Sequence, residues 1–311
     1  MILRTILERI GNTSLVALRR LVPANGTRIL LKMECENPTG SMKDRMALAM
    51  IEAAERDGRL PTGGPVVEYT GGSTGVSLSL VCGVKGHPLH VVSSDAFARE
   101  KLDHMAILGA QLTVIASDNG RMTAQLTKDM IEAARAIAAE TGAYWTNQLS
   151  NPDQIAGYHP MGDEIWRQTG GRVDAYVQSV GSSGSLQGTA QVLRRHNPRL
   201  QVIAVEPAES PVLSGGASGA HKIDGIGAGF VVPLWDPTVP NHIERVSTDE
   251  AKAMALRLAR EEGIFAGTST GANVAAALRV AETLPPGSTL ITVMCDTGMK
   301  YLSQLRTSPG T

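Results

Sequence analysis

Lys43 lies in the segment NPTGSMKDR (37–45), where a turn leads into a predicted helix. The opening Asn-Pro-Thr-Gly is typical of a turn, and Ser41-x-x-Asp44 forms a capping box, so the lysine falls in the first helical turn. The positive end of the helix dipole, together with any burial, favours a free amine over an ammonium, and a free amine is a nucleophile. The same pattern is also typical of a capped helix with a solvated lysine, because most lysines are exposed.

A second segment, EYTGGSTG (68–75), runs from a strand through a glycine turn into a helix. Backbone N–H groups at such a helix start bind carboxylate or phosphate. The hydroxyls of Thr70, Ser73 and Thr74 add hydrogen-bond donors. The alternative is a glycine turn that serves only to pack the strand against the helix.

The segment GSSGSLQG (181–188) also follows a predicted strand. It lacks the Gly-Lys-Ser/Thr of a P-loop, and its first glycine spacing is one residue too wide for the dinucleotide fingerprint G-x-G-x-x-G. Glu206, however, ends the next strand, about where a ribose-binding acid falls in nicotinamide dehydrogenases. An anion-binding loop is indicated, and a dehydrogenase stays open as an alternative.

Two further segments, GTSTGAN (267–273) and MCDTG (294–298), combine hydroxyls with glycines. The second follows the last clear strand, and open α/β sheets bind ligands at the carboxyl ends of their strands. Serine, threonine and glycine also simply cap helices, so each segment is a weak signal by itself.

The elements that must position these segments alternate along the chain. Short β-branched runs predict strands, and stretches with helical periodicity lie between them. We expect strands at 29–34, 67–69, 89–93, 111–115, 173–180, 201–206 and 289–295, and helices near 42–57, 74–84, 97–108, 184–196, 248–262 and 270–283. A further helix is predicted by the i+3/i+4 spacing of Met122, Leu126, Met130, Ala133 and Ile137. This alternation predicts an α/β fold whose parallel sheets are covered on both faces. The pattern breaks near 148–152, and 207–246 is predicted to be a long, functional loop.

The composition limits the class of partner. The 311 residues include 29 basic and 30 acidic side chains, which excludes a strong attraction to nucleic acid or anionic membranes and favours a small molecule. The N-terminus does not resemble a signal peptide, and no apolar run approaches the roughly 20 residues of a membrane helix. Three dispersed cysteines indicate a reducing compartment, and no metal site is predicted. We therefore expect a soluble, cytoplasmic protein.

Taken in order, these segments resemble the cysteine synthase (O-acetylserine sulfhydrylase) family of fold type II pyridoxal-phosphate (PLP) enzymes. The resemblance extends over nearly the whole chain, through IGNTSLVAL (10–18), NQLSNPDQIAGYHPMGDEIW (147–166), AVEPAESPVLSGG (204–216) and HKIDGIGAGFVVP (221–233). It implies two domains, each with a mostly parallel sheet flanked by helices, as in the tryptophan synthase β subunit. The smaller, mobile domain would span 37–148, and the larger 149–311, with 1–36 packed on it. It also implies a homodimer.

The resemblance assigns roles to individual residues. Lys43 would form the Schiff base with pyridoxal 5'-phosphate and later shuttle the α-proton. The other implied cofactor ligands are Ser73, the phosphate loop Gly181, Ser182, Ser183, Gly184 and Ser185, and Thr297 facing the pyridine nitrogen. The implied substrate-binding residues are Thr70, Gly71, Gly72, Ser73, Thr74 and Gln148 for the carboxylate, and Gly225, Ile226 and Gly227 beside the leaving group and nucleophile.

The implied reaction is β-replacement on an O-activated serine such as O-acetylserine, through an α-aminoacrylate that adds sulfide to give L-cysteine. Gly71 and Ser73 depart from the family, which usually has serine and asparagine there, and the segment 93–105 also differs. Another donor such as O-phosphoserine, or an amine or thiol nucleophile, therefore stays open. A serine or threonine dehydratase is a further alternative, although the loop 225–230 argues against it. A non-catalytic relative is disfavoured because Lys43 is present.

Overall fold

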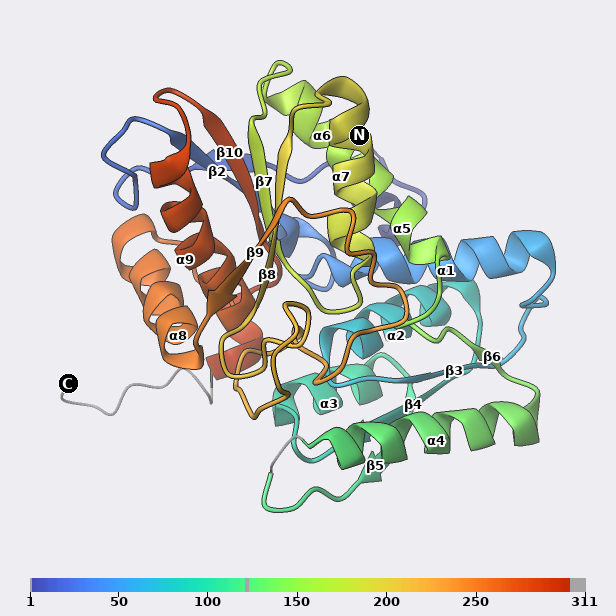
Figure 1. Cartoon of the computed structure of the whole chain (residues 1–311). Coiled ribbons are helices and arrows are strands. Elements are labelled where there is room, and N and C mark those ends of the chain that lie inside the picture. The colour runs from blue at the N-terminus through green and yellow to red at the C-terminus, as the bar shows by residue number, and fades with distance from the viewer. Residues whose placement is uncertain (1, 121–122, 303–311) are drawn as a thin grey trace.

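The larger of two sheets has six strands in the order β1-β2-β10-β7-β8-β9 (Figure 1). The computed structural model describes residues 2–120 and 123–302. The strands are β1 (Leu15–Ala17), β2 (Arg28–Met33), β7 (Ala175–Ser179), β8 (Gln201–Pro207), β9 (His242–Val246) and β10 (Thr289–Met294). All neighbouring pairs are parallel except β1 with β2. The central strands β7 and β10 are buried along their whole length, as expected for a parallel sheet covered on both faces.

Helices cover both faces of this sheet (Figure 1). On one face α9 (Thr268–Thr283) packs against the strands, and α8 (Thr248–Arg257) packs on α9. A short π-helix at Leu258–Glu262 continues α8. On the other face lie α5 (Asp153–Gly157), α6 (His159–Gln168) and α7 (Gly184–His196).

The smaller sheet has four parallel strands in the order β5-β4-β3-β6. These are β3 (Val66–Tyr69), β4 (Leu89–Ser94), β5 (Gln111–Ile115) and β6 (Tyr144–Trp145). Helix α4 (Ala124–Thr141) covers one face, and α2 (Ser73–Lys85) packs on the other together with α1 (Lys43–Asp57) and α3 (Arg99–Ile107). Three of these helices end on a left-handed glycine, at Gly58, Gly86 and Gly142, the usual way to stop a helix cleanly.

The predicted α/β class with mostly parallel sheets flanked by helices is confirmed. The stretch 207–246 was predicted wrongly at its end, because His242–Val246 forms the edge strand β9, while 208–241 has no helix or strand. The short elements β1, β6, α5 and α6 were not predicted. The domain bounds 37–148 and 149–311 stay a prediction, and residues 121–122 and 303–311 lie outside the described part. Within that part, no helix is both long and apolar enough to cross a membrane.

Candidate active site

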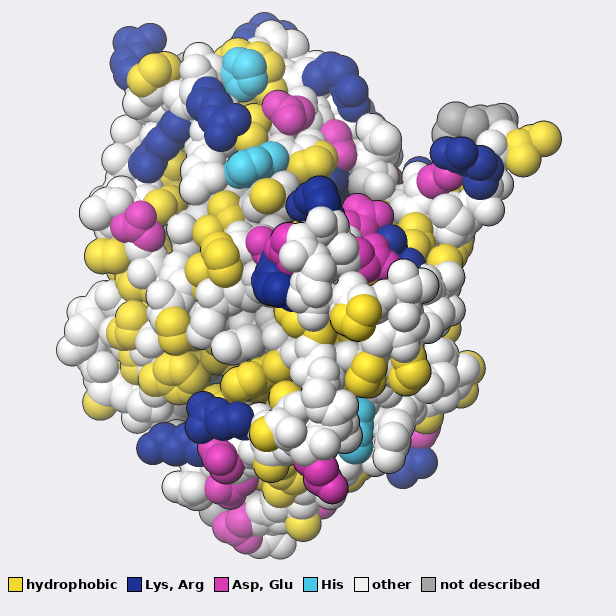
Figure 2. Space-filling view, turned by 90° about the vertical axis from the view of Figure 1, so that its right-hand side faces the viewer, with side chains coloured by type: hydrophobic (Ala, Val, Ile, Leu, Met, Phe, Trp, Pro, Cys, Tyr) yellow, Lys and Arg dark blue, Asp and Glu magenta, His cyan; other side chains and the backbone are white. Residues whose placement is uncertain are grey.

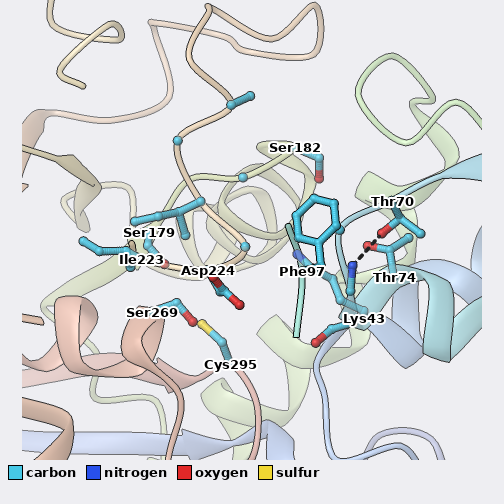
Figure 3. Close-up of a pocket in the computed structure, with 18 of the residues that line it drawn as sticks. Lys43, Thr70, Thr74, Phe97, Ser179, Ser182, Ile223, Asp224, Ser269 and Cys295 are labelled. Atoms are coloured by element: carbon cyan, nitrogen blue, oxygen red, sulfur yellow. Dashed lines mark hydrogen bonds between the residues drawn. The ribbon is translucent and has the colours of Figure 1, made fainter. Parts of the chain in front are cut away.

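A cavity of about 270 Å³ lies between the two sheets and collects the segments singled out in the sequence (Figure 3). In Figure 3 the side chains of Lys43, Thr70 and Thr74 lie on one side, and those of Ser179, Ser269 and Cys295 on the other. The predicted site residues that line the cavity are Lys43, Thr70, Gly71, Gly72, Ser73, Thr74, Gln148, Gly181, Ser182, Ser185, Gly225, Ile226 and Gly227. Ser183, Gly184 and Thr297 are not among the lining residues.

Lys43 is the first residue of α1, and its burial lowers the pKa of its amine. Among the described residues, none forms a hydrogen bond with its Nζ, so the amine is available to a ligand. The expected capping box is only half formed. Ser41 Oγ accepts the Lys43 N–H at 3.2 Å, but the Asp44 carboxylate is directed to the Thr39 N–H at 2.8 Å instead of the Ser41 backbone.

A buried ionic cluster supports the start of α1. Arg45 Nε lies 2.7 Å from Glu34 Oε2, and its Nη2 lies 2.8 Å from Glu164 Oε2. Lys32 Nζ lies 2.7 Å from the same Glu164 oxygen. All four side chains are nearly inaccessible to solvent, so α1 is tied to the large sheet two residues beyond Lys43.

The segment 70–74 forms a turn held by its own hydroxyls. Thr70 Oγ1 accepts the Gly72 N–H at 3.2 Å, and α2 begins at Ser73. Thr74 Oγ1 donates to Gln148 Oε1 at 2.8 Å, and Gln148 Nε2 donates to the Tyr69 carbonyl at 2.9 Å. The first N–H groups of α2 have no intrahelical acceptor and face the same cavity edge, which suits a carboxylate.

Glu68 forms hydrogen bonds with residues on both sides of the turn, Tyr69 and Gln148. It is fully buried at the end of β3, and burial raises the pKa of its carboxyl to about 7. The Thr146 hydroxyl and the N–H groups of Tyr69 and Gln148 donate to its oxygens, the two N–H groups each at 2.9 Å. Glu68 thereby fixes the strand β6 and the side of the cavity that carries Gln148.

Ser73 bonds to a carboxylate on the opposite half of the molecule. Its Oγ donates to Asp296 Oδ2 at 2.9 Å, and the Tyr301 hydroxyl donates to the same oxygen at 2.6 Å. The other oxygen, Oδ1, is buried with no hydrogen-bond partner within the described residues. Ser73 therefore joins the two halves across the cavity, and Asp296 keeps one oxygen for a further partner.

The loop 181–185 leads from β7 into α7. Ser183 adopts a left-handed backbone with φ of +76°, uncommon for a residue with a side chain and often found at functional sites. The Ser182 hydroxyl donates to Gln154, whereas the Ser183 hydroxyl accepts from Gln187 Nε2 at 2.9 Å and keeps its own proton to donate. A Cβ at Gly181 would lie 2.4 Å from the Gly225 carbonyl, which brings the two predicted loops into contact. The N–H groups at the start of α7, with Ser185 lining the cavity beside them, are donors that suit a phosphate.

Thr297 does not line the cavity, and its implied role toward the pyridine nitrogen stays a prediction. Its N–H donates to the Gly40 carbonyl at 2.9 Å, and its hydroxyl accepts the Met299 N–H at 3.3 Å to cap a short 3-10 helix. Its methyl group packs against Gly40, where a Cβ would lie 2.8 Å from it. Ser269, in the first turn of α9, instead lines the cavity. The segment GTSTGAN had given a signal for this position, but too weak to select Ser269.

Several lining residues were not selected from the sequence. They include Phe97, Lys101, Ser179, Asp224 and Cys295. Ser179 Oγ is buried without a hydrogen-bond partner in the described part of the chain, and burial raises the pKa of the Cys295 thiol to about 11. Lys101 is itself buried, lies 2.9 Å from Asp224, and stacks its ammonium 4.1 Å from the centre of the Tyr301 ring.

The charged groups outside the cavity form no obvious second site. In the described ranges, no group of three or more His, Cys, Asp or Glu side chains could hold a metal ion. Figure 2 shows basic and acidic side chains interspersed over one face, with apolar side chains between them. The three cysteines, Cys35, Cys82 and Cys295, are free thiols.

The donor set fits pyridoxal phosphate. An amine of lowered pKa, a helix start able to bind phosphate and the unpartnered, buried Ser179 hydroxyl share one cavity. Comparison with known proteins agrees, since the family described as "Pyridoxal-phosphate dependent enzyme" matches residues 6–296.

The chain is 37% identical over 300 residues to the cysteine synthase of Staphylococcus aureus, covering 96% of this chain and 95% of that one. Among solved structures, cysteine synthase from Entamoeba histolytica superposes with a TM-score of 0.93 at 35% identity, covering 100% of this chain and 93% of that one. An O-ureido-L-serine synthase also superposes with a TM-score of 0.93, at 33% identity, covering 100% and 98%. The chain belongs to the cysteine synthase family of fold type II PLP-dependent enzymes.

Proposed function

We propose that this enzyme replaces the β-substituent of an O-activated L-serine with sulfide to form L-cysteine. The observation that carries the proposal is the free amine of Lys43 in a cavity whose rim holds the starts of both α2 and α7. The first helix start suits the α-carboxylate of an amino acid, and the second suits the cofactor phosphate. The names of the relatives in Staphylococcus aureus and Entamoeba histolytica support the same reaction.

Residues of this chain would hold the cofactor at three points. Lys43 Nζ would bind it covalently, the N–H groups of the 181–185 loop would bind its phosphate, and Ser269 would offer a neutral hydroxyl to the ring nitrogen. We prefer Ser269 to Thr297 because Ser269 lines the cavity and Thr297 does not. Bound pyridoxal phosphate supplies an electron sink that makes the α-proton of an amino acid removable.

The protein's own groups would then carry out the proton transfers. With an amino acid bound to the cofactor, Lys43 Nζ would be the free amine that accepts the α-proton. The lowered pKa of this amine favours its neutral form. The turn 70–74 and Gln148 would orient the substrate by its carboxylate. The contacts Ser73–Asp296 and Lys101–Asp224 join the two halves and would keep water out after closure of the smaller domain.

The charges in the cavity favour an acetyl ester over a phosphate ester as the leaving group. Of the cationic side chains that line the described cavity, Lys101 is already paired with Asp224. Both ring nitrogens of His221 are engaged, because Nδ1 accepts the Ile223 N–H at 3.3 Å and Nε2 contacts the Gly227 carbonyl at 2.9 Å. A second phosphate dianion would therefore find no free cation beside Lys43. A cytoplasmic homodimer, as the family resemblance implies, is part of the same proposal.

The test is reconstitution of the purified protein with pyridoxal phosphate. We expect a visible absorption band from lysine-bound cofactor, and cysteine from O-acetylserine and sulfide. Lys43→Ala should abolish both, whereas Lys128→Ala, on the exposed side of α4, should change neither. A protein that captures no cofactor would refute the proposal. Cofactor capture with pyruvate or another 2-oxo acid as the only product, even with sulfide present, would favour the dehydratase instead.

A further inference from the structure

The chain after β10 runs beside the turn that leads into α1. Ser41 and Asp296 form an antiparallel bridge between these two segments. Next to this bridge, the Met42 N–H donates to the Cys295 carbonyl at 2.9 Å. Lys43 follows directly, so Lys43 and Asp296 extend from neighbouring stretches of backbone, and both line the cavity.

Asp296 supplies negative charge to the amine of Lys43. Burial lowers the pKa of this amine, and the Cys295 and Asp296 side chains oppose that change electrostatically. Burial also raises the pKa of the Cys295 thiol to about 11, so this thiol stays neutral at ordinary pH. An aspartate is ordinarily an anion throughout the range in which an amine titrates. Of the two described side chains that oppose the effect of burial on Lys43, Asp296 is therefore the anion.

The surroundings of Asp296 hold its carboxylate without cancelling its charge. Its Oδ2 accepts from the Ser73 hydroxyl at 2.9 Å and from the Tyr301 hydroxyl at 2.6 Å, and both donors are neutral. The buried amine of Lys300 also acts on Asp296, but it makes no hydrogen bond within the described part of the chain, and burial lowers its pKa. Lys101 is paired with another carboxylate. No described cation therefore forms an ion pair with Asp296.

The proposed reaction requires Lys43 to hold a proton inside the cavity. The amine accepts the α-proton and later returns a proton to the α-carbon, so it is an ammonium between the two transfers. Burial of an ammonium without a nearby anion is strongly disfavoured and lowers the pKa of the amine. A general base works best when its pKa lies near the working pH. A carboxylate in the same cavity limits the loss of basicity that burial would otherwise cause.

We propose that Asp296 is a positioning residue for proton transfer, whose negative charge stabilises the ammonium form of Lys43 within the cavity. This inference rests on the proposed function, in which Lys43 accepts the α-proton. Asp296 acts through Lys43 and has no contact with the reacting atoms in this role. One residue from each half of the molecule, Ser73 and Tyr301, fixes the position of its carboxylate.

The role of the charge is tested first on protein without cofactor, by the rate at which Lys43 captures pyridoxal phosphate at different pH values. The neutral amine is the nucleophile, so the rate rises as the pH passes through the pKa of this amine. Asp296→Asn should move the midpoint of the profile down by about one pH unit. The amide oxygen can accept both bonds now made to Oδ2, and its NH₂ replaces Oδ1, which has no hydrogen-bond partner among the described residues. Asp296→Ser serves as a second uncharged variant in case Asp296→Asn does not fold.

Tyr301→Phe and Asp224→Asn are matched controls. The first removes a hydrogen bond to Asp296 and keeps its charge. The second neutralises another carboxylate that lines the cavity, one that is paired with Lys101. Neither control should move the midpoint. An unchanged midpoint in the uncharged variants at position 296 would overturn the inference. An equal shift in Tyr301→Phe would also overturn it, because the effect would then come from packing.

A second readout uses cofactor-loaded protein with L-alanine, which has no leaving group. Exchange of its α-proton for deuterium in D₂O, followed by NMR, reports proton transfer to and from Lys43. Asp296→Asn should lower the pH midpoint of exchange and slow exchange on the high-pH plateau, because a base of lower pKa accepts the α-proton less readily. Failure of the wild-type protein to capture pyridoxal phosphate would refute the proposed function. Capture and exchange with the same midpoints in wild type and Asp296→Asn would refute only this inference.

Discussion

Glu68 gives the protein a dependence of stability on pH that is opposite in sign to that of most carboxylates. Its pKa is raised from 4.5 to about 7 by burial, and it forms no ion pair with a described side chain. The folded protein therefore binds this proton more tightly than the unfolded chain. The free energy of unfolding should fall as the pH rises from about 4.5 to about 7 and stay level above that range.

The magnitude follows from the two pKa values. A tenfold change in proton affinity is worth about 1.4 kcal/mol, so a rise from 4.5 to about 7 corresponds to about 3 kcal/mol. Glu68→Gln removes the titration while keeping the size of the side chain. The variant loses some stability at every pH, because an amide N–H₂ replaces an oxygen that accepts a hydrogen bond. The pH-dependent part of the difference is the prediction.

Urea unfolding at pH 5 and at pH 8 measures the pH-dependent part of the free energy of unfolding. The wild type should lose about 3 kcal/mol more than Glu68→Gln between these values. Other groups titrate in both proteins and cancel in the comparison. Glu132→Gln, an exposed change on α4, is the control and should track the wild type. Parallel pH profiles for the wild type and Glu68→Gln would mean that the three donors around the carboxylate outweigh its burial, and would refute the reasoning.

Three further predictions concern the supports of the site. Arg45→Met leaves the buried Glu34 without an ion-pair partner and Glu164 with Lys32 alone, and should cost about 3–5 kcal/mol in urea unfolding. A loss below about 1 kcal/mol would contradict a structural role for this cluster. Lys101→Met leaves a partly exposed Asp224 unpaired and should cost about 1–2 kcal/mol, and no loss would mean that the contact between the halves is immaterial. Ser269→Ala should shift the visible absorption of bound cofactor. Thr297→Ala should lower the free energy of unfolding by about 1 kcal/mol without such a shift. The reverse pattern would favour Thr297 as the partner of the ring nitrogen.

The sequence was sufficient to predict that the segments with candidate binding residues meet at one site. Each chemical segment follows a predicted strand or begins a predicted helix, and parallel strands present their carboxyl ends at one edge of a sheet. The turn 70–74 and the loop 181–185 could therefore be expected to face Lys43, and they line one cavity with it.

The direction of individual side chains could not be predicted in this way. Both Ser269 and Thr297 carry a hydroxyl in a glycine-containing segment, but Ser269 lines the cavity, whereas the Thr297 hydroxyl caps a 3-10 helix. A Cβ on Gly71 would lie 2.1 Å from the ring of Phe97. This contact depends on how two separate turns meet, which no local pattern encodes. The strand β9 was missed because its short apolar–polar alternation adjoins a stretch rich in glycine and proline.

The order of strands in the large sheet has a consequence for synthesis of the protein. The strand β10 lies between β2 and β7, although it is the last strand of the described chain and β2 is the second. At about 5–20 residues per second, roughly 13–50 s separate the two strands as they leave a ribosome. During that interval β2 lacks one neighbour and β7 lacks another, and the wall of the cavity formed by Cys295 and Asp296 does not yet exist. The smaller sheet can pair its strands once β6 has been made, well before β10. Capture of the cofactor by Lys43 should therefore be among the last events in the maturation of the chain.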